Sequence, residues 1–275
     1  MKLKYFAVAA LAALLGLSAC SDDKGAQSEA KANSSESKKI VVATSANFAP
    51  FEFVDGGEFK GIDMDIARHI AKELNAELVI SDMEFDSVVT SVASSKAKLA
   101  ISGLTVNEAR QKVINFSDNY YSASQMVIVK KDDERFNAIT DKDALIKALN
   151  EAKGLKIGVQ VGTTGLFYAK GDADWGFEGF KDAKVESYPN AGSATNDMLN
   201  GRVDVVIIDE MPARELVKSN PATKLLDIPL TDEKYAIGID PKESELKAKV
   251  DKILSDMKAD GTLDNIISAY FSESK

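Results

Sequence analysis

Residues 102–110 read SGLTVNEAR and contain the residue types that a receptor for a carboxylate requires. Gly103 lets the main chain approach a ligand closely, and Thr105 offers a hydroxyl group. Asn107 can cap a short helix that carries Arg110, whose planar guanidinium forms two parallel hydrogen bonds to a carboxylate. The alternative is an ordinary surface turn with an exposed ion pair at Arg110.

Two later segments offer the groups that would complete such a site. GVQVGTTG ends a strand and begins a helix at Thr163 or Thr164, which supplies free amides and partial positive charge. VVIIDE ends an apolar strand at Asp209, at the carboxyl edge where α/β proteins bind ligands. Burying either charged end of a free amino acid without a partner is costly, so Arg110 and Asp209 together suit its carboxylate and its ammonium. For Asp209, too, a surface ion pair is the alternative.

The elements that must position these residues alternate between strand and helix patterns. The β-branched run IVVAT at 40–44 is typical of a buried parallel strand, and the segment 62–74 repeats apolar residues at helical spacing. The turn DGG between 51–54 and 59–62 predicts a hairpin. Further alternation along the chain predicts an α/β fold with a parallel sheet.

The alternating pattern occurs twice. It begins afresh after a long extended run near 121–128 and ends at another extended run near 232–239. Two crossings between two α/β units form a hinge, and the cleft between such units is a favoured site for small ligands. We expect one domain to contain 40–123 and 233–275, and the other to contain 124–232.

The composition argues against several classes of function. The 275 residues carry a formal charge of −9, whereas a nucleic-acid-binding surface needs a basic stripe. One Cys and one His are too few for a zinc site or a Cys–His nucleophile pair. GTTG lacks the Lys of a phosphate-binding loop, and the acids of DMD at 63–65 suit a helix start. We therefore expect no metal, no cofactor and no nucleic-acid partner.

The first residues read MKLKYFAVAALAALLGLSAC, with a basic start and an apolar run too short to span a bilayer. LSAC resembles the lipobox of bacterial lipoproteins, which implies a signal peptide at 1–19 and a lipid on Cys20. An ordinary secretory peptide that leaves a free thiol is the alternative. The polar residues 20–39 predict a flexible tether. We expect an extracytoplasmic protein that is lipid-anchored to a membrane, in the periplasm or at the cell surface.

Five segments in order carry a family resemblance: VVATSANFAPFEF, GIDMDIARHIAKEL, LAISGLTVNEARQKVINFSDNYY, VGTTG and VVIIDEMPA. They resemble the polar amino-acid-binding proteins of bacterial ABC importers, solute-binding protein family 3, which include glutamine-, histidine- and lysine/arginine/ornithine-binding proteins. The resemblance covers nearly all of residues 40–272. It implies a type II periplasmic-binding-protein fold, in which two lobes joined by a two-strand hinge close on one amino acid. It also implies an ABC permease as partner, and we expect a monomer.

The resemblance also implies roles for individual residues. By position, Arg110 pairs with the ligand carboxylate and Asp209 with its ammonium. Other ligand-binding positions are the Gly103 amide, Thr105 and Thr164 toward the carboxylate, the carbonyl region of Ser102–Gly103 toward the ammonium, and Phe48 and Phe85 around the side chain. For the two phenylalanines the alternative is a place in the core.

Three departures from the family pattern bear on the ligand. Ser45 stands where binders of basic and amide side chains have Asp, Gln160 where the glutamine receptor has Lys, and Ile208 where that receptor has a polar residue. No charged group remains at these positions to pair with a charged side chain, and an unpaired buried charge is costly. We expect a ligand with an uncharged side chain, polar or modestly apolar.

Two other classes of function remain as alternatives. Some relatives on this fold are cyclohexadienyl dehydratases, which need a general acid and no ammonium partner. The intact Asp209 and the apolar Ile208 favour binding over catalysis, so we expect no enzyme activity. A surface adhesin is the third reading, and a sensor is disfavoured because no signalling domain is attached.

Overall fold

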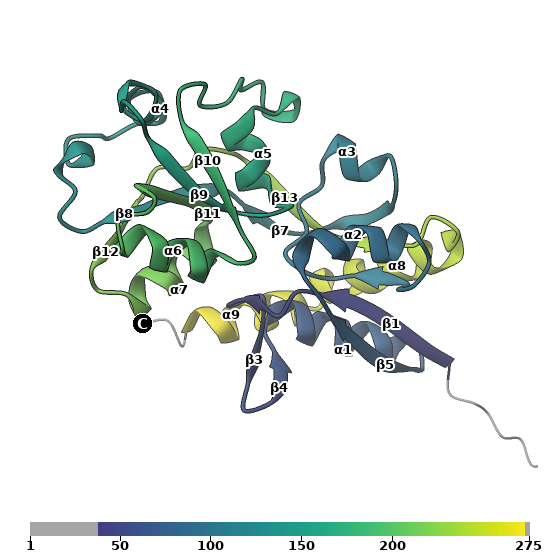
Figure 1. Cartoon of the computed structure of the whole chain (residues 1–275). Helices are drawn as coiled ribbons and strands as arrows, with labels where there is room; N and C mark the ends of the chain where they lie inside the picture. Colours follow the sequence, from purple (N-terminus) through teal and green to yellow (C-terminus); the bar gives the residue numbers. More distant parts are fainter. Residues whose placement is uncertain (1–37, 273–275) are drawn as a thin grey trace, which may run out of the picture. The chain divides into compact units, whose positions relative to one another are not determined.

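The computed structural model describes residues 38–272, and within this range the strands form two five-stranded sheets and one three-stranded sheet. Sheet 1 has the order β5-β1-β6-β13-β7 and sheet 2 the order β10-β9-β11-β8-β12. Figure 1 shows sheet 2 with its own helices in the teal and green part of the chain. The α/β pattern predicted from the sequence is confirmed.

Sheet 1 combines parallel and antiparallel pairs. Strand β1 pairs in parallel with β5 and β6, whereas β13 pairs antiparallel with β6 and β7. The strands are β1 (Lys38–Thr44), β5 (Ala76–Asp82), β6 (Leu99–Ala100), β7 (Asn115–Ala123) and β13 (Glu233–Ile239). Its helices are α1 (Ile62–Glu73), α2 (Phe85–Ala93), α3 (Glu108–Gln111), α8 (Ser244–Ala259) and α9 (Thr262–Ser272).

Both faces of sheet 1 are covered. Ile62, Ile66 and Ile70 of α1 are fully buried with Val42 of β1, α8 and α9, which confirms the helical repeat. The neighbouring Ala43 points to the other core, beneath α2. The small sheet of β2 (Asn47–Phe48), β3 (Glu52–Asp55) and β4 (Glu58–Lys60) contains the predicted hairpin.

Sheet 2 has the same layered construction. Val205 and Ile207 of its central β11 pack into one core with α4 and α5, whereas Val206 and Ile208 pack into another with α6 and α7. This explains the continuous apolar run of the strand. The strands are β8 (Gln125–Lys130), β9 (Lys156–Gln160), β10 (Lys184–Tyr188), β11 (Val205–Asp209) and β12 (Thr223–Leu226). The helices are α4 (Lys142–Glu151), α5 (Thr164–Lys170), α6 (Ala191–Leu199) and α7 (Glu210–Ser219), with 3-10 turns η1 (Glu134–Phe136) and η2 (Ala173–Trp175).

The chain passes between the sheets at the two expected places. Only Ser124 separates β7 of sheet 1 from β8 of sheet 2, and the return path enters sheet 1 at β13. The domain boundaries themselves stay a prediction. Glu84 is the N-cap of α2, and the short edge strand β12 lacked a sequence signal.

The predicted signal peptide, Cys20 and most of the predicted tether lie outside the described residues. Between residues 38 and 272, none of the helices combines the length and apolar character that crossing a membrane requires.

Candidate functional site

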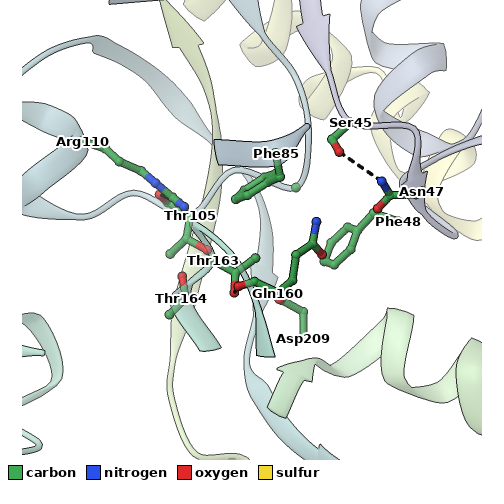
Figure 2. Close-up of a pocket in the computed structure, with 11 residues that line it drawn as sticks. Ser45, Asn47, Phe48, Phe85, Thr105, Arg110, Gln160, Thr163, Thr164 and Asp209 are labelled. Carbon is green, nitrogen blue, oxygen red and sulfur yellow. Dashed lines mark hydrogen bonds between the residues drawn. The ribbon is translucent and has the colours of Figure 1, made fainter. Parts of the chain in front are cut away.

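One pocket is lined by residues from the sides of both sheets. Figure 2 shows their side chains converging on it. The lining residues are Ser45, Asn47, Phe48, Phe85, Gly103, Thr105, Arg110, Gln160, Thr163, Thr164 and Asp209. Of the ligand-binding positions expected from the sequence, all but Ser102 line this pocket, and Ser102 lies fully buried behind it.

Strand ends bring these residues together. Ser45 directly follows β1 and Gly103 comes shortly after β6, on the sheet 1 side. Gln160 is the last residue of β9 and Asp209 the last of β11, on the sheet 2 side. The pocket therefore lies at the carboxyl edges of parallel strands, where ligands of α/β proteins bind.

Arg110 is held in place by its own short helix. Asn107 caps α3 by accepting a hydrogen bond from the Arg110 amide at 2.8 Å, as the sequence predicts. Arg110 is 6% exposed, and its guanidinium donates to the carbonyl oxygens of Thr105 at 2.6 Å and Gly162 at 3.0 Å. It lies 5.5 Å from the ring centroid of Phe85. Within the described residues these bonds engage two of its five N–H groups, which leaves three for a ligand.

The electrostatics of the guanidinium suit an anion. Burial lowers the pKa of Arg110 to about 10, while Glu233 and Asp209 oppose that shift. The side chain is therefore cationic at neutral pH. A buried cation with three free donors is a strong site for a carboxylate.

Asp209 is 5% exposed and accepts a hydrogen bond from the Tyr235 hydroxyl. Burial, assisted by the charge of Glu233, raises the pKa of Asp209 to about 7. A positive partner would reverse this shift, because it favours the ionised carboxylate. An ammonium group in the pocket would supply that charge.

The two threonines at the start of α5 differ in their bonding. Thr163 is the N-cap, and its hydroxyl donates to the carbonyl of Gln160 at 2.8 Å. Thr164 is 2% exposed, and its hydroxyl has no hydrogen-bond partner within the described residues. A buried hydroxyl without a partner is costly, so a ligand oxygen that bonds it would stabilise the closed site.

Two of the expected ligand donors already have acceptors in the protein. The Gly103 amide donates to Oδ2 of Asp63 at 2.6 Å, and the Thr105 hydroxyl donates to Oε2 of Glu233 at 2.6 Å. Thr105 therefore presents a lone pair, not a proton, to the pocket. In this conformation neither residue offers the hydrogen bond to a carboxylate that the resemblance implies.

The aromatic side chains form the walls on the sheet 1 side. Phe48 and Phe85 both line the pocket, and Phe48 also packs against Phe51 with ring centroids 6.0 Å apart. Gly103 lies against Phe48, because a Cβ atom there would come within 2.8 Å of the ring. The absence of a side chain at Gly103 therefore lets the ring occupy its place.

Sequence reasoning missed several residues of the site. Asn47 and Thr163 line the pocket without having been assigned a ligand contact, and the amide of Asn47 donates to the Ser45 hydroxyl at 3.3 Å (Figure 2). The buried acids Glu52, Asp63 and Glu233 support the pocket from behind. A signal existed for Glu52, since an acid between two phenylalanines in PFEF is unusual for a surface hairpin.

The fold and this pocket identify the class of protein. Residues 40–273 match the family of bacterial extracellular solute-binding proteins, family 3, and the chain belongs to that family. Among curated relatives, the arginine-binding extracellular protein ArtP of Bacillus subtilis (strain 168) is 30% identical over 243 residues, which cover 86% of this chain and 88% of ArtP. The fold is the expected type II periplasmic-binding-protein fold.

Solved structures agree. The amino acid ABC transporter substrate-binding protein AbpA from Streptococcus pneumoniae, bound to L-arginine, has a TM-score of 0.75 and 35% identity, covering 86% of this chain and 95% of AbpA. An ancestral arginine-binding protein bound to glutamine has a TM-score of 0.74 and 34% identity, covering 85% of this chain and 97% of that protein. The ancestral amino acid-binding protein AncCDT-1, a precursor of cyclohexadienyl dehydratase, has a TM-score of 0.72 and 28% identity, covering 85% of this chain and 95% of AncCDT-1.

Proposed function

We propose that the protein is the extracytoplasmic substrate-binding component of an ABC importer and that it closes on one free L-amino acid. The family and the printed functions of its relatives support the transport role. The observation that carries the proposal is the pairing of two buried opposite charges, Arg110 beside sheet 1 and Asp209 on sheet 2, in one pocket. A zwitterion would pair with both, which favours the closed state.

The head group then has a defined orientation. Its carboxylate accepts hydrogen bonds from the remaining N–H groups of Arg110 and from the hydroxyl of Thr164. Its ammonium lies against Asp209, and the lone pair of Thr105 accepts one of its protons. We prefer this role for Thr105 because its own proton is engaged with Glu233.

We further propose that the ligand side chain is uncharged. The polar side chains of the lining that are left for it are the neutral Ser45, Asn47 and Gln160. The two charged side chains of the lining, Arg110 and Asp209, bind the head group. A guanidinium or carboxylate there would lack a charged partner. A side-chain amide such as that of glutamine would find both donors and acceptors.

Arginine is the second candidate for the ligand. The structure of AbpA contains bound L-arginine, and ArtP is named an arginine-binding protein. The buried acids around the pocket also outnumber its one buried cation, the guanidinium of Arg110. Their combined field would favour an additional positive charge, although none of these acids other than Asp209 lines the pocket.

Calorimetry with all twenty amino acids tests whether the protein binds a free amino acid and whether the bound side chain is uncharged. A ligand of about ten heavy atoms, at up to ~1.5 kcal/mol per atom, reaches micromolar affinity or better. We expect such affinity for an amino acid with an uncharged side chain. Tighter binding of arginine would overturn the side-chain assignment alone, whereas no binding of any amino acid would overturn the function.

We propose no catalytic activity. AncCDT-1 shows that the fold has a neighbour that preceded a dehydratase. In this chain Asp209 is available for an ammonium and its neighbour Ile208 is apolar, which supports binding. Incubation with prephenate and arogenate is the direct check, and product formation by the purified protein would contradict the proposal.

We also propose the lipid anchor at Cys20 and a monomeric protein that hands its ligand to a membrane permease. The Cys20→Ser variant should lose metabolic palmitate labelling and leave the membrane fraction. Retention of label in that variant would contradict the anchor. An adhesive role is the competing reading, tested by binding of labelled cells to the immobilised protein.

A further inference from the structure

Two carboxyl groups lie fully buried behind the loop that begins at Ser102. Glu52 is the first residue of β3, and Asp63 lies in the first turn of α1; both are 0% exposed. Neither lines the pocket, and no ion pair found within the described residues includes either of them. Two buried acids without a cation need another explanation.

Hydrogen bonds connect both acids to the loop. Asp63 accepts from the Gly103 amide at 2.6 Å and from the Tyr120 hydroxyl at 2.8 Å. Glu52 accepts on Oε1 from the Ser102 hydroxyl at 2.7 Å. The Ser102 oxygen in turn accepts from the Ser45 amide at 3.0 Å. Through Ser102, the two acids are thus linked both to Ser45, which faces the ligand side chain, and to the loop beside the ligand head group.

The bonding pattern locates a proton. The second oxygen of Glu52, Oε2, is buried and receives no hydrogen bond from an N–H or O–H donor of the described residues. Both acids bond adjacent residues of one loop, Ser102 and Gly103, and two neighbouring buried carboxyl groups without a cation favour the state in which one of them is protonated. Asp63 already accepts from an amide and a hydroxyl, which stabilise its anion, so the proton belongs to Glu52.

The titration behaviour of the pair agrees with this assignment. Burial and the charge of Asp63 raise the pKa of Glu52 well above its ordinary value. Burial raises the pKa of Asp63 to about 6, opposed by its bonds from Gly103 and Tyr120. The other ionisable groups that face the pair are Tyr120 and, across the pocket, Asp209.

We propose that Glu52 and Asp63 are positioning residues, with Glu52 protonated and Asp63 ionised, and that they hold the loop from Ser102 to Thr105 in its binding conformation. The inference rests on the proposed function, because the loop contributes Gly103 and Thr105 to the pocket. It also explains why the Gly103 amide is withdrawn from the ligand: the amide secures the loop while Arg110 and Thr164 receive the carboxylate.

The decisive experiment uses three variants of the full chain, with L-glutamine and L-arginine as probes. Glu52→Ala removes the acceptor of the Ser102 hydroxyl, and we expect its affinity to fall about tenfold or more, as for a buried polar group left unsatisfied. Glu52→Gln should restore most of that loss, because its amide oxygen accepts from Ser102 and its side chain, like that of protonated Glu52, carries no charge. Asp63→Asn should bind about tenfold more weakly or worse, because its NH₂ group meets other donors.

A second measurement does not depend on any ligand. The infrared spectrum of the wild-type protein at pH 8 should contain the C=O band of a protonated carboxyl group, and Glu52→Gln should lack it. Thermal melts identify a variant that fails to fold, and the band and Glu52→Gln remain informative if Asp63→Asn is such a variant. Absence of the band, or a loss in Glu52→Gln as large as in Glu52→Ala, would overturn the proposal. If neither probe binds the wild type but the band is present, the proposed function fails and the protonation of Glu52 stands.

Discussion

The guanidinium of Arg110 donates to the main-chain oxygen of Gly162 at 3.0 Å, and this bond joins α3 beside sheet 1 to the loop after β9 of sheet 2. The same side chain carries the donors that face the pocket. One residue therefore contributes to closure and to ligand recognition at once, and its replacement should affect both.

Arg110→Lys separates charge from geometry. The lysine keeps a positive charge but cannot form the forked pair of bonds to a carboxylate while also reaching Thr105 and Gly162. Truncating one partner of a buried charge pair costs on the order of 2–5 kcal/mol, so Arg110→Ala should abolish measurable binding. Arg110→Lys should bind with intermediate affinity. Calorimetry and a thermal melt of each variant check this, and unchanged affinity in Arg110→Ala would remove the residue from the site.

Ligand affinity should fall below neutral pH because of Asp209. Its pKa is about 7 in the unliganded protein, and an ammonium partner requires the ionised form. Binding below pH 7 therefore releases a proton, and affinity should fall by up to about tenfold per pH unit between pH 7 and 5. Calorimetry in two buffers with different ionisation enthalpies measures the released proton. Equal affinity at pH 8 and pH 6 would contradict the role of Asp209.

The same raised pKa affects stability in the opposite direction. An acid whose pKa is higher in the folded state destabilises that state as pH rises from its unfolded value toward about 7. Asp209→Asn removes this penalty and keeps an acceptor for the Tyr235 hydroxyl. The variant should melt at a higher temperature than wild type at pH 8 without ligand, and the difference should shrink at pH 4. A lower melting temperature at pH 8 would contradict the raised pKa.

Gly103→Ala should weaken binding through Phe48. Gly103 has a φ of +49°, and an added Cβ would come within 2.8 Å of the Phe48 ring. Gly57→Ala is the matched control, because Gly57 has a φ of +84° with no atom within 4 Å of the added Cβ. Each should lose about 1–2 kcal/mol of stability from backbone strain. Only Gly103→Ala should also lose affinity, and equal affinities in the two variants would contradict the contact.

Asp174 of η2, on the sheet 2 side, forms a second hydrogen bond to α3, beside sheet 1. Its Oδ2 accepts from the Glu108 amide at the start of α3 at 2.9 Å, and the neighbouring Trp175 is the only tryptophan of the chain. Asp174→Ala should weaken binding about two- to fivefold without touching the pocket, because the closed state loses a capping bond. Asp182→Ala removes an equally exposed acid and should bind as wild type. Intrinsic fluorescence provides the titration, and equal affinities in both variants would exclude the contact from closure.

Much of the architecture followed from local pattern. Apolar runs predicted β1 and β11, and Asn107 predicted the start of the helix that carries Arg110. These features depend on periodicity and capping, which act over a few residues. The short edge strand β12 is harder to predict, because tertiary pairing decides such strands.

Residue identity and order along the chain were enough to select an α/β fold, a fixed cation at Arg110 and a fixed anion at Asp209, since strand ends and helix starts place such groups predictably. Three-dimensional packing alone decided which donors remain free. Glu52, Asp63 and Glu233 come from distant segments, yet they accept the hydrogen bonds of Ser102, Gly103 and Thr105. Hydrogen-bond partners far apart in the chain leave no local pattern, because desolvation and contact exist only after the segments meet.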